Sequence, residues 1–191
     1  MNSSSNIRTF IAVKIKPEPE LVNLLHNCRD VFEGEAIKWV EENNLHLTLK
    51  FLGETSPAQI QEVKNCIENS GAKYSSFVFQ LNGLGYFESK GQPRVLFSGI
   101  RNFEQMKLFV ADLEACLNNL GFEKENREFK PHLTIGRIKF LKDKRRFYRF
   151  VEEYKNQTFQ IITVTGIVFY QSILKTNRPQ YIPLHVVQLN S

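Results

Sequence analysis

The sequence predicts an α+β fold built from two related halves. Strand-like and helix-like segments alternate along the 191 residues without a long linker, so residues 1–191 are expected to form one domain of two lobes that share a groove. Strand candidates begin at Arg8 and Arg94, and again at His46 and His132, and both pairs are 86 positions apart. A duplication with an approximate two-fold axis would produce this spacing, although α+β proteins without a duplication also show such alternation.

The first half has clear start and stop signals for its helices. Pro17 opens a helix in which apolar residues recur at helical spacing, and Gly34 can end it. Ser56 supplies the N-cap and Pro57 the first turn of a second helix. In chain order, apolar and β-rich runs indicate strands at residues 8–15, 37–40 and 45–52.

Glycines punctuate the second half. Gly83 and Gly85 interrupt a long extended segment, where a bulge or bend is expected, and Gly121 ends a helix. The last helix carries Phe147, Phe150 and Tyr154 on one face. The expected helices are residues 103–120 and 143–154, and the expected strands are residues 77–87, 94–100, 132–140, 159–170 and 181–187.

The composition is that of a globular protein with a basic balance of charge. Hydrophobic residues make up 42% of the chain and charged residues 24%, and no apolar run approaches the roughly 18 residues that span a bilayer. The start of the chain lacks the pattern of a secretory signal, so residues 1–7 are expected to be disordered. The protein is therefore expected to be a cytoplasmic monomer without a membrane partner. A net charge of +5 favours an anionic partner.

The three cysteines, Cys28, Cys66 and Cys116, are expected to be free thiols. An odd count without a Cys-x-x-Cys pair argues against a disulfide scaffold and against a cysteine zinc site. Each cysteine falls in a predicted helix, where a small thiol packs well when it is buried. Free thiols fit a reducing cytoplasm.

Two His-x-Thr motifs stand at the start of two strand candidates, at His46 and at His132. Successive side chains of a strand point to opposite faces, so His46, Thr48 and Lys50 are expected to share one face. His132 and Thr134 likewise share a face, and apolar residues between them form the opposite face. A lone strand histidine is usually a surface residue, but two of the four histidines occur here in matched context. The other two, at positions 26 and 185, are expected to be structural.

This pair of histidines suits the cleavage of a phosphodiester. Histidine titrates near neutrality, so one imidazole can accept a proton while the other donates one. The entering and leaving oxygens lie roughly in line at phosphorus, and histidines on facing strands would flank it from both sides. A threonine hydroxyl two residues on can bond a non-bridging oxygen. The reaction needs no metal, and the sequence shows no metal-ligand cluster of Asp and His near either motif.

The two segments resemble the motifs of the 2H phosphoesterase superfamily, and in particular of the RNA 2',3'-cyclic phosphodiesterases, also called 2'-5' RNA ligases. The resemblance extends over nearly the whole chain. It implies a bilobed fold in which duplicated antiparallel sheets, with helices outside, line a central active-site cleft. It also implies hydrolysis of the 2',3'-cyclic phosphate end of an RNA or oligonucleotide to a 2'-phosphate, without a cofactor, and a secondary activity on 2'-5' linkages. The residues that carry it are 10–13, 44–54, 93–97, 121–123 and 129–134.

The resemblance assigns roles to the matching positions. His46 becomes the proton donor to the leaving 3' oxygen, and His132 the proton acceptor that activates water. Thr48, Thr134 and Arg137 would bind the phosphate. Lys50 is added to these phosphate-binding residues because alternation places it on the face of the first histidine.

Strict alternation places Arg137 on the face opposite His132, which conflicts with its expected role in binding the phosphate. The second motif carries one extra residue, Gly136, before its cation. A β-bulge at Gly136 would turn Arg137 into the cleft. A regular ladder through Gly136 would contradict this hypothesis.

Two alternatives stay open. A non-catalytic RNA-binding module would use the basic charge and the aromatic residues, with Phe51, Tyr86, Phe87 and Tyr170 as conceivable stacking platforms, although core packing is the better expectation for each. A basic run from Lys139 to Arg149 could steer RNA or be a solvated helix face. A second alternative is a 2H enzyme that acts on another cyclic phosphodiester.

Overall fold

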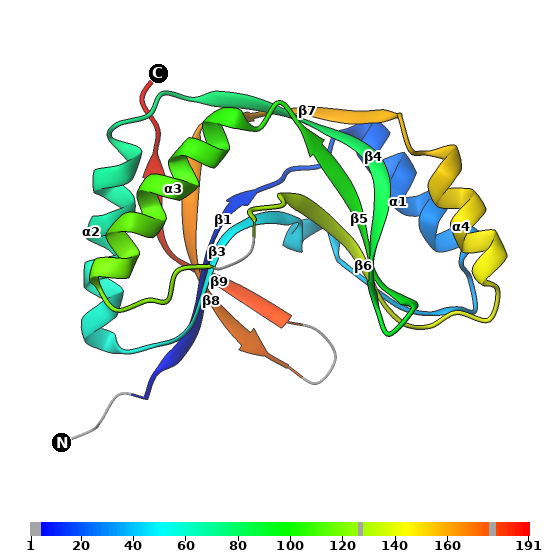
Figure 1. Cartoon of the computed structure of the whole chain (residues 1–191), viewed down its shortest axis with the longest axis horizontal. Helices are drawn as coiled ribbons and strands as arrows, with labels where there is room; N and C mark the ends of the chain where they lie inside the picture. The colour runs from blue at the N-terminus through cyan, green and yellow to red at the C-terminus, as the bar shows by residue number, and fades with distance from the viewer. Residues whose placement is uncertain (1–4, 126–127, 176–178) are drawn as a thin grey trace.

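The computed structural model describes residues 5–125, 128–175 and 179–191, and within these ranges it contains two antiparallel sheets (Figure 1). The four-stranded sheet has the order β3-β1-β8-β9, with β3 at His46–Thr55, β1 at Ile7–Lys14, β8 at Gly166–Leu174 and β9 at Pro179–Gln188. The five-stranded sheet has the order β2-β6-β5-β4-β7, with β2 at Ala36–Trp39, β6 at His132–Phe140, β5 at Gln92–Arg101, β4 at Phe77–Ser89 and β7 at Thr158–Val164. The predicted α+β class with paired antiparallel sheets is confirmed.

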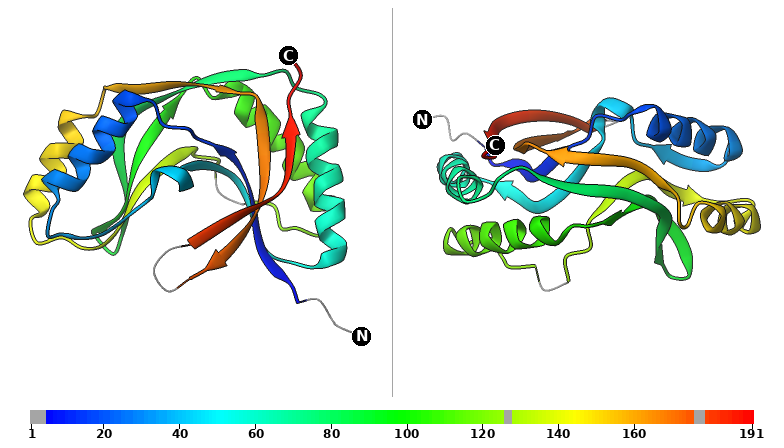
Figure 2. Two further views of the ribbon diagram at one scale, coloured as in Figure 1. Left: turned by 180° about the vertical axis from the view of Figure 1, so that it is seen from behind. Right: turned by 90° about the horizontal axis from the view of Figure 1, so that it is seen from above.

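The helices lie outside the sheets in two pairs. The pairs are α2 (Pro57–Gly71) with α3 (Glu104–Asn119), and α1 (Pro19–Val31) with α4 (Lys144–Glu153). The first pair packs on the four-stranded sheet, where α2 contacts β8 and β9 and α3 contacts β3, while α1 contacts β7 and α4 contacts β4 of the other sheet. Seen from behind and from above, the two pairs lie at opposite ends of the molecule (Figure 2). A short 3-10 helix, Glu42–Asn44, precedes β3.

Each sheet has a helix-covered outer face and an inner face. In β1, Ile11 and Val13 belong to the main hydrophobic core under the helices. Phe10 and Ala12, which alternate with them, belong to a small separate cluster on the inner face together with Val168, Tyr170 and Tyr181. Period-two alternation therefore sorts one strand into a core side and a side that is available for a site.

The two sheets repeat one arrangement, as the 86-residue spacing predicts. The order β3-β1-β8-β9 corresponds to β6-β5-β4-β7, and β3 contacts β6 where the two halves meet. His46 and His132 are the first residues of their strands. Strands β1 and β5, which lie next to the motif strands, are offset by one residue from the 86-residue spacing. Ala12 of β1 pairs with Thr48, and Phe97 of β5 pairs with the equivalent Thr134. Arg8 and Arg94 are therefore not equivalent, which corrects the prediction.

Most elements form where the local signals place them. Ser56 accepts a hydrogen bond from Gln59 N in a capping box that opens α2, and Asp143 caps α4 by accepting from Arg146 N at 3.0 Å. The β4–β5 ladder shifts register between Leu81 and Leu84, as expected beside the glycine that separates them.

Two predictions about the strands are wrong. The segment 159–170 is not one strand, because the chain leaves the five-stranded sheet after β7 and enters the four-stranded sheet as β8. Thr165 lies at the break, and its carbonyl accepts a hydrogen bond from Leu189 N at 2.9 Å. Ile7 was expected to be disordered but begins β1, because it pairs with Thr55 of β3. Residues 1–4 lie outside the described part of the chain.

None of the helices in the described ranges is long and apolar enough to cross a membrane.

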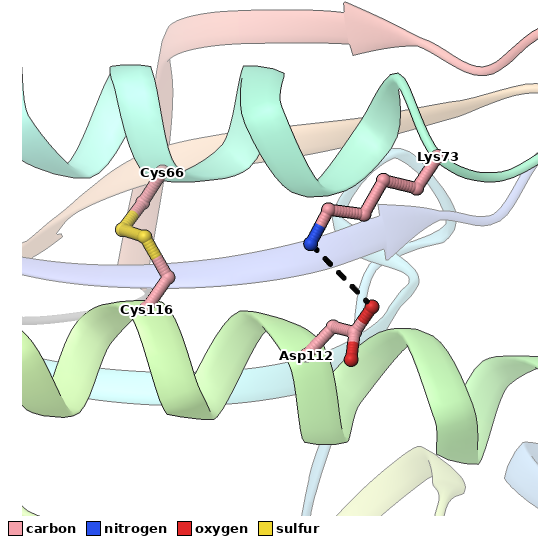
Figure 3. Close-up of a disulfide and its surroundings, with 4 residues drawn as sticks. All are labelled: Cys66, Lys73, Asp112 and Cys116. Carbon is pink, nitrogen blue, oxygen red and sulfur yellow. Dashed lines mark ion pairs between the residues drawn. A yellow bond between two sulfur atoms is a disulfide. The ribbon is translucent and has the colours of Figure 1, made fainter.

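The expectation of three free thiols is wrong for two of the cysteines. Cys66 of α2 and Cys116 of α3 form a disulfide, with their Cα atoms 5.9 Å apart (Figure 3). Each cysteine lies on a helix, as predicted, but the two helices pack side by side, and sequence spacing does not reveal that contact. Cys28 is buried and free, and burial raises the pKa of its thiol to about 12, so it remains an unreactive core residue.

The disulfide is expected to contribute strongly to stability. It closes a loop with a sequence separation of 50 residues, and a crosslink of that size stabilises a protein by about 2–4 kcal/mol, chiefly by restricting the unfolded chain. A reductant should therefore lower the urea midpoint of the wild-type chain by an amount equivalent to this free energy. The paired variant Cys66→Ala with Cys116→Ala should unfold at the lower midpoint with or without reductant. A wild-type midpoint that ignores the reductant would show that the bridge does not form in solution.

Candidate active site

The two predicted histidines are held in the same way. His46 Nδ1 lies 2.7 Å from the carbonyl oxygen of Asn44, and His132 Nδ1 lies 2.9 Å from that of Lys130. A carbonyl oxygen only accepts hydrogen bonds, so Nδ1 carries the proton and Nε2 is the free nitrogen of each neutral ring. Each imidazole is thus tied back to the residue two positions before it, at the first position of its strand. Both rings therefore keep Nε2 for a ligand.

Aromatic rings surround both histidines on the inner faces. Around His46, the centroids of Phe10 and Tyr181 lie 5.0 Å and 4.9 Å from that of the imidazole. The ring of His132 lies 4.8 Å from Phe87 and 5.4 Å from Phe97. These rings come from strands next to the motif strands or from farther across the sheets. No sequence motif marks Phe10, Phe97 or Tyr181 as neighbours of the histidines, although the alternation in β1 places Phe10 opposite the core.

The surroundings of both histidines favour the neutral imidazole by lowering its pKa. Burial lowers the pKa of His46, and the positive charges of Arg137 and His132 lower it further, against the opposing effect of the Asn44 carbonyl. Burial also lowers the pKa of His132, again assisted by Arg137. A cation disfavours protonation of a neighbouring imidazole. A bound phosphate would reverse this effect, because its negative charge favours an imidazolium.

Thr48 and Thr134 lie on the same inner faces as their histidines. Thr48 pairs with Ala12, a member of the inner cluster, and Thr134 pairs with Phe97. Both threonines are half-buried, whereas the residues that separate them from the histidines are buried in the core. Each motif thus presents an imidazole and a hydroxyl on one face of its sheet, and the binding of phosphate by the two threonines stays a prediction.

The predicted bulge before Arg137 is present. Thr134 pairs with Phe97 and Gly136 with Leu96, so Ile135 is the extra residue. The bulge lies one position before the predicted glycine. It turns Arg137 to the exposed inner side of β6, where its charge acts on both histidines.

Gly136 is required for close packing against β2 and not for the bulge itself. Strand β2 lies against this position, and a Cβ atom on Gly136 would approach Ile37 Cγ2 and Trp39 Cε3 to 2.9 Å. Real Cβ atoms rarely come so close to other heavy atoms. The glycine therefore leaves room for the side chains of Ile37 and Trp39 over this position of β6.

Lys50 is not at this site, and its prediction as a phosphate-binding residue is wrong. In β3, Thr48 pairs with Ala12 and Lys50 with Ile11, so Leu49 is the extra residue of a bulge. The bulge turns Lys50 to the helix-covered face, where it is 8% exposed.

Phe51 takes the inner-face position instead. Its ring lies 6.0 Å from that of Phe10 and is 63% exposed. By the 86-residue spacing, Phe51 is the counterpart of Arg137.

The other aromatic candidates divide between surface and core. Phe87 is 36% exposed beside His132. Tyr170 is buried and stacks on Phe10, and Tyr86 packs against Phe147 of α4.

The remaining polar candidates also lie away from the two motifs. The basic run from Lys139 to Arg149 continues from β6 into α4, the helix that packs against β4 on the outside of the five-stranded sheet (Figure 1). The other two histidines take part in side-chain pairs, His185 with Glu68 at 2.8 Å and His26 with Glu42 at 3.5 Å. Across residues 5–125, 128–175 and 179–191, no three His, Cys, Asp or Glu side chains gather in a metal-binding arrangement.

Two sheets that each present a histidine and a threonine on an inner face, with one arginine charge acting on both histidines, are the arrangement of a phosphoesterase with two histidine motifs. Residues 13–97 and 101–181 match the family described as LigT like Phosphoesterase, and the chain belongs to this family.

Proteins and solved structures of similar sequence support this membership. The chain is 34% identical over 175 residues to an RNA 2',3'-cyclic phosphodiesterase of Methanocaldococcus jannaschii, covering 92% of this chain and 96% of that protein. It is 32% identical to the protein of the same name from Thermotoga maritima, with 95% of each chain covered. A crystal structure of a Thermus thermophilus protein superposes with a TM-score of 0.79 at 26% identity, covering 96% of this chain and 98% of that one. E. coli LigT, at 24% identity and a TM-score of 0.75 over 98% of this chain and 100% of that one, shares the fold.

Removal of the shared cation should raise the pKa of both histidines. Without the positive charge of Arg137, the imidazolium forms lose a repulsive neighbour and become more favourable. We expect Arg137→Met to move the NMR titration midpoints of His46 and His132 to higher pH. Arg94→Met is the matched control, because Arg94 hydrogen-bonds to the carbonyl of Lys139. Equal midpoints in wild type and Arg137→Met would place the guanidinium out of electrostatic reach of the histidines.

Proposed function

We propose that this chain hydrolyses the 2',3'-cyclic phosphate end of RNA to a 2'-phosphate and a free 3'-hydroxyl. The observation that carries the proposal is the matched pair of imidazoles. His46 and His132 each donate Nδ1–H to a backbone carbonyl and keep Nε2 free on an inner face. Hydrolysis of a cyclic phosphodiester needs one proton acceptor and one proton donor, and two histidines supply both without a metal.

The reaction then proceeds by a balanced pair of proton transfers. His132 Nε2 accepts a proton from water as the water oxygen forms its bond to phosphorus. The bond between phosphorus and the 3' oxygen breaks, and protonated His46 donates its Nε2 proton to that oxygen. The two imidazoles end with their charges exchanged, and proton exchange with solvent restores them. The assignment of donor and acceptor follows the resemblance to the family.

The neighbouring groups stabilise the charge that develops on the phosphoryl oxygens. Thr48 and Thr134 carry hydroxyl donors on the same faces as the two histidines. Arg137 adds a permanent positive charge that acts on both imidazoles. Donors fixed in advance around a developing negative charge are among the strongest contributions to catalysis. The same cation favours one neutral histidine as the acceptor, and the bound anion favours a protonated donor.

The curated relatives support the substrate class. Archaeal and bacterial proteins at 30–34% identity, covering 90% or more of this chain, carry the name RNA 2',3'-cyclic phosphodiesterase. A 2'-5' phosphodiester can in principle be made or broken by the same donor and acceptor, because opening and closing of the cyclic phosphate use the same proton transfers in opposite directions. We therefore include 2'-5' linked dinucleotides as secondary substrates, with the cyclic phosphate end as the main one.

Loss of either imidazole should abolish most of the activity. We expect His46→Ala and His132→Ala each to lower kcat for an oligoribonucleotide with a 2',3'-cyclic phosphate end by about 10²–10⁴-fold, the usual contribution of a general acid or base. His26→Ala is the matched control, because this histidine is exposed and pairs with Glu42 away from the two motifs. Chromatographic separation of cyclic, 2'-phosphate and 3'-phosphate ends measures the rate and the position of cleavage.

The same assay separates the alternatives. A non-catalytic RNA-binding module would bind the oligonucleotide but leave the cyclic end intact in the wild-type chain. An enzyme for another cyclic phosphodiester would prefer cyclic nucleotides or other small cyclic phosphates in a substrate panel. Full activity in both alanine variants would refute the two-histidine mechanism.

A further inference from the structure

An exposed arginine, Arg8, lies on the inner face of the sheet that carries His46. In β1, Arg8 alternates with Phe10, which belongs to the inner cluster, and Thr9 between them is buried on the other side. The ladder between β1 and β8 is regular from Thr9 to Ala12, so alternation holds along this part of the strand. The guanidinium of Arg8 therefore extends from the same side of the sheet as the imidazole.

Tyr181 of β9 lies between the histidine and this arginine. Its ring centroid is 4.9 Å from that of His46 and 5.0 Å from that of Phe10. Burial raises the pKa of the Tyr181 hydroxyl, and the positive charges of Arg137 and Arg8 act against this effect. One hydroxyl group thus stands within electrostatic reach of both arginines. The inner face carries a cation at the two histidines and another at the far side of Tyr181.

Arg8 stands farther along β1 than the predicted site of the cyclic phosphate. Ala12 pairs with Thr48, a predicted phosphate ligand, and Arg8 lies four residues earlier (12 − 8). At about 3.3 Å per residue, the two positions are about 13 Å apart along the strand. This separation suits the next phosphate of a bound strand better than the phosphate at Thr48.

Pairing within the sheet does not account for Arg8. Glu54 of β3 is its partner in the ladder, and both side chains are exposed. Among the residues that the structure describes, no ion pair includes either of them, and an exposed pair would add little stability. The buried hydroxyls of Thr9 and Thr55, 2.6 Å apart, join the two strands at this point instead. The guanidinium is therefore available to an anionic ligand.

The second half of the molecule has an uncharged residue at the equivalent position. Strands β1 and β5 are related by 85 residues (97 − 12), because Ala12 and Phe97 pair with the equivalent threonines of the two motifs. By this offset, Arg8 corresponds to Pro93, which is buried. The duplicated plan thus places an arginine here in the four-stranded sheet alone, and this difference gives a bound strand a direction.

We propose that Arg8 binds the phosphate on the 5' side of the terminal nucleotide, so that RNA ends are preferred over cyclic mononucleotides. The inference rests on the proposed function and deepens it. With the cyclic phosphate between His46 and His132, the RNA runs over the inner face of the four-stranded sheet, past Tyr181 to Arg8. Phosphate contacts fix the position of a nucleic acid and carry no sequence information. Arg8 therefore selects the length of the substrate and not its last base.

Three substrates test the inference: a nucleoside 2',3'-cyclic phosphate, the same nucleotide with an added 5'-phosphate, and a dinucleotide with a 2',3'-cyclic end. The wild type should have a higher kcat/KM for the second and third than for the first. In Arg8→Met this advantage should fall by about tenfold, because a charge-assisted contact is lost. Arg8→Lys, which keeps the charge, should retain part of it.

Arg94→Met is the matched control. Arg94 is an exposed arginine of the other sheet whose guanidinium donates to the carbonyl oxygen of Lys139. Its replacement changes the net charge by the same amount and should leave the preference for the longer substrates as in the wild type. Thermal unfolding of each variant gives the folded fraction, to which every rate is normalised.

A second measurement does not depend on turnover. Calorimetry gives the Kd of the dinucleotide 2'-phosphate product at a series of salt concentrations. Loss of one phosphate contact with a single strand should decrease the slope of log Kd against log salt by about 0.7. The affinity lost in Arg8→Met should be the same for all four terminal bases. A loss that depends on the terminal base would assign Arg8 to base recognition and overturn the inference.

Other outcomes separate the inference from the proposed function. An active wild type without a preference for the longer substrates, or with a preference that Arg8→Met leaves unchanged, would refute the inference alone. In the second case, equal losses of thermal stability in Arg8→Met and Glu54→Gln would leave Arg8 a structural partner of Glu54. A wild type that opens none of the three substrates would refute the proposed function and the inference with it. An effect on the dinucleotide but not on the 5'-phosphorylated nucleotide would place Arg8 at the second nucleoside and overturn the phosphate assignment.

Discussion

The site depends on one constraint of β-structure, the alternation of side chains between the two faces of a strand. Alternation places His46 and Thr48 on the inner face and Leu47 in the core, and a bulge then breaks the rule at Leu49. The same break occurs in β6, where Ile135 is the extra residue. In each motif strand the bulge shifts the alternation by one residue. The histidine and threonine follow the alternation before the bulge, and the later residues follow the shifted one. Without this shift, Arg137 would lie behind the sheet.

The two halves use one backbone plan but different side chains, and under the proposed mechanism these differences distinguish the donor from the acceptor. Arg137 stands on the inner face of one half where Phe51 stands in the other, and Lys50 faces outward where the second half has Gly136. The histidines themselves are oriented identically by carbonyl oxygens two residues before them. Symmetry therefore supplies two equivalent imidazoles, and the residues after the bulges supply a cation, Arg137, that acts on both.

Much of this arrangement could be predicted from local sequence, because local rules govern it. Alternation over three residues predicts the shared faces of His46 with Thr48 and of His132 with Thr134. The bulge before Arg137 could be predicted because a regular strand would place this arginine on the face opposite His132. The bulge at Leu49 has no glycine to mark it, so Lys50 was placed on the wrong face. The Cys66–Cys116 bridge depends on the packing of α2 against α3. The break within 159–170 likewise depends on which sheet each part joins, and neither feature leaves a periodic signal.

The long-range contacts that the sequence hides are also those that set the distance between the two histidines. The chain changes sheets from β1 to β2, again from β2 to β3, and again from β3 to β4. It returns to the four-stranded sheet between β7 and β8. One continuous hydrophobic core, from Ile11 in β1 to Leu133 in β6, lies under both sheets. Two reacting groups on separate sheets gain from preorganisation only if the sheets hold their relation to one another. The crossing connections, the shared core and the helix pair fastened by the disulfide supply that relation, so the precision of the site is a property of the whole fold.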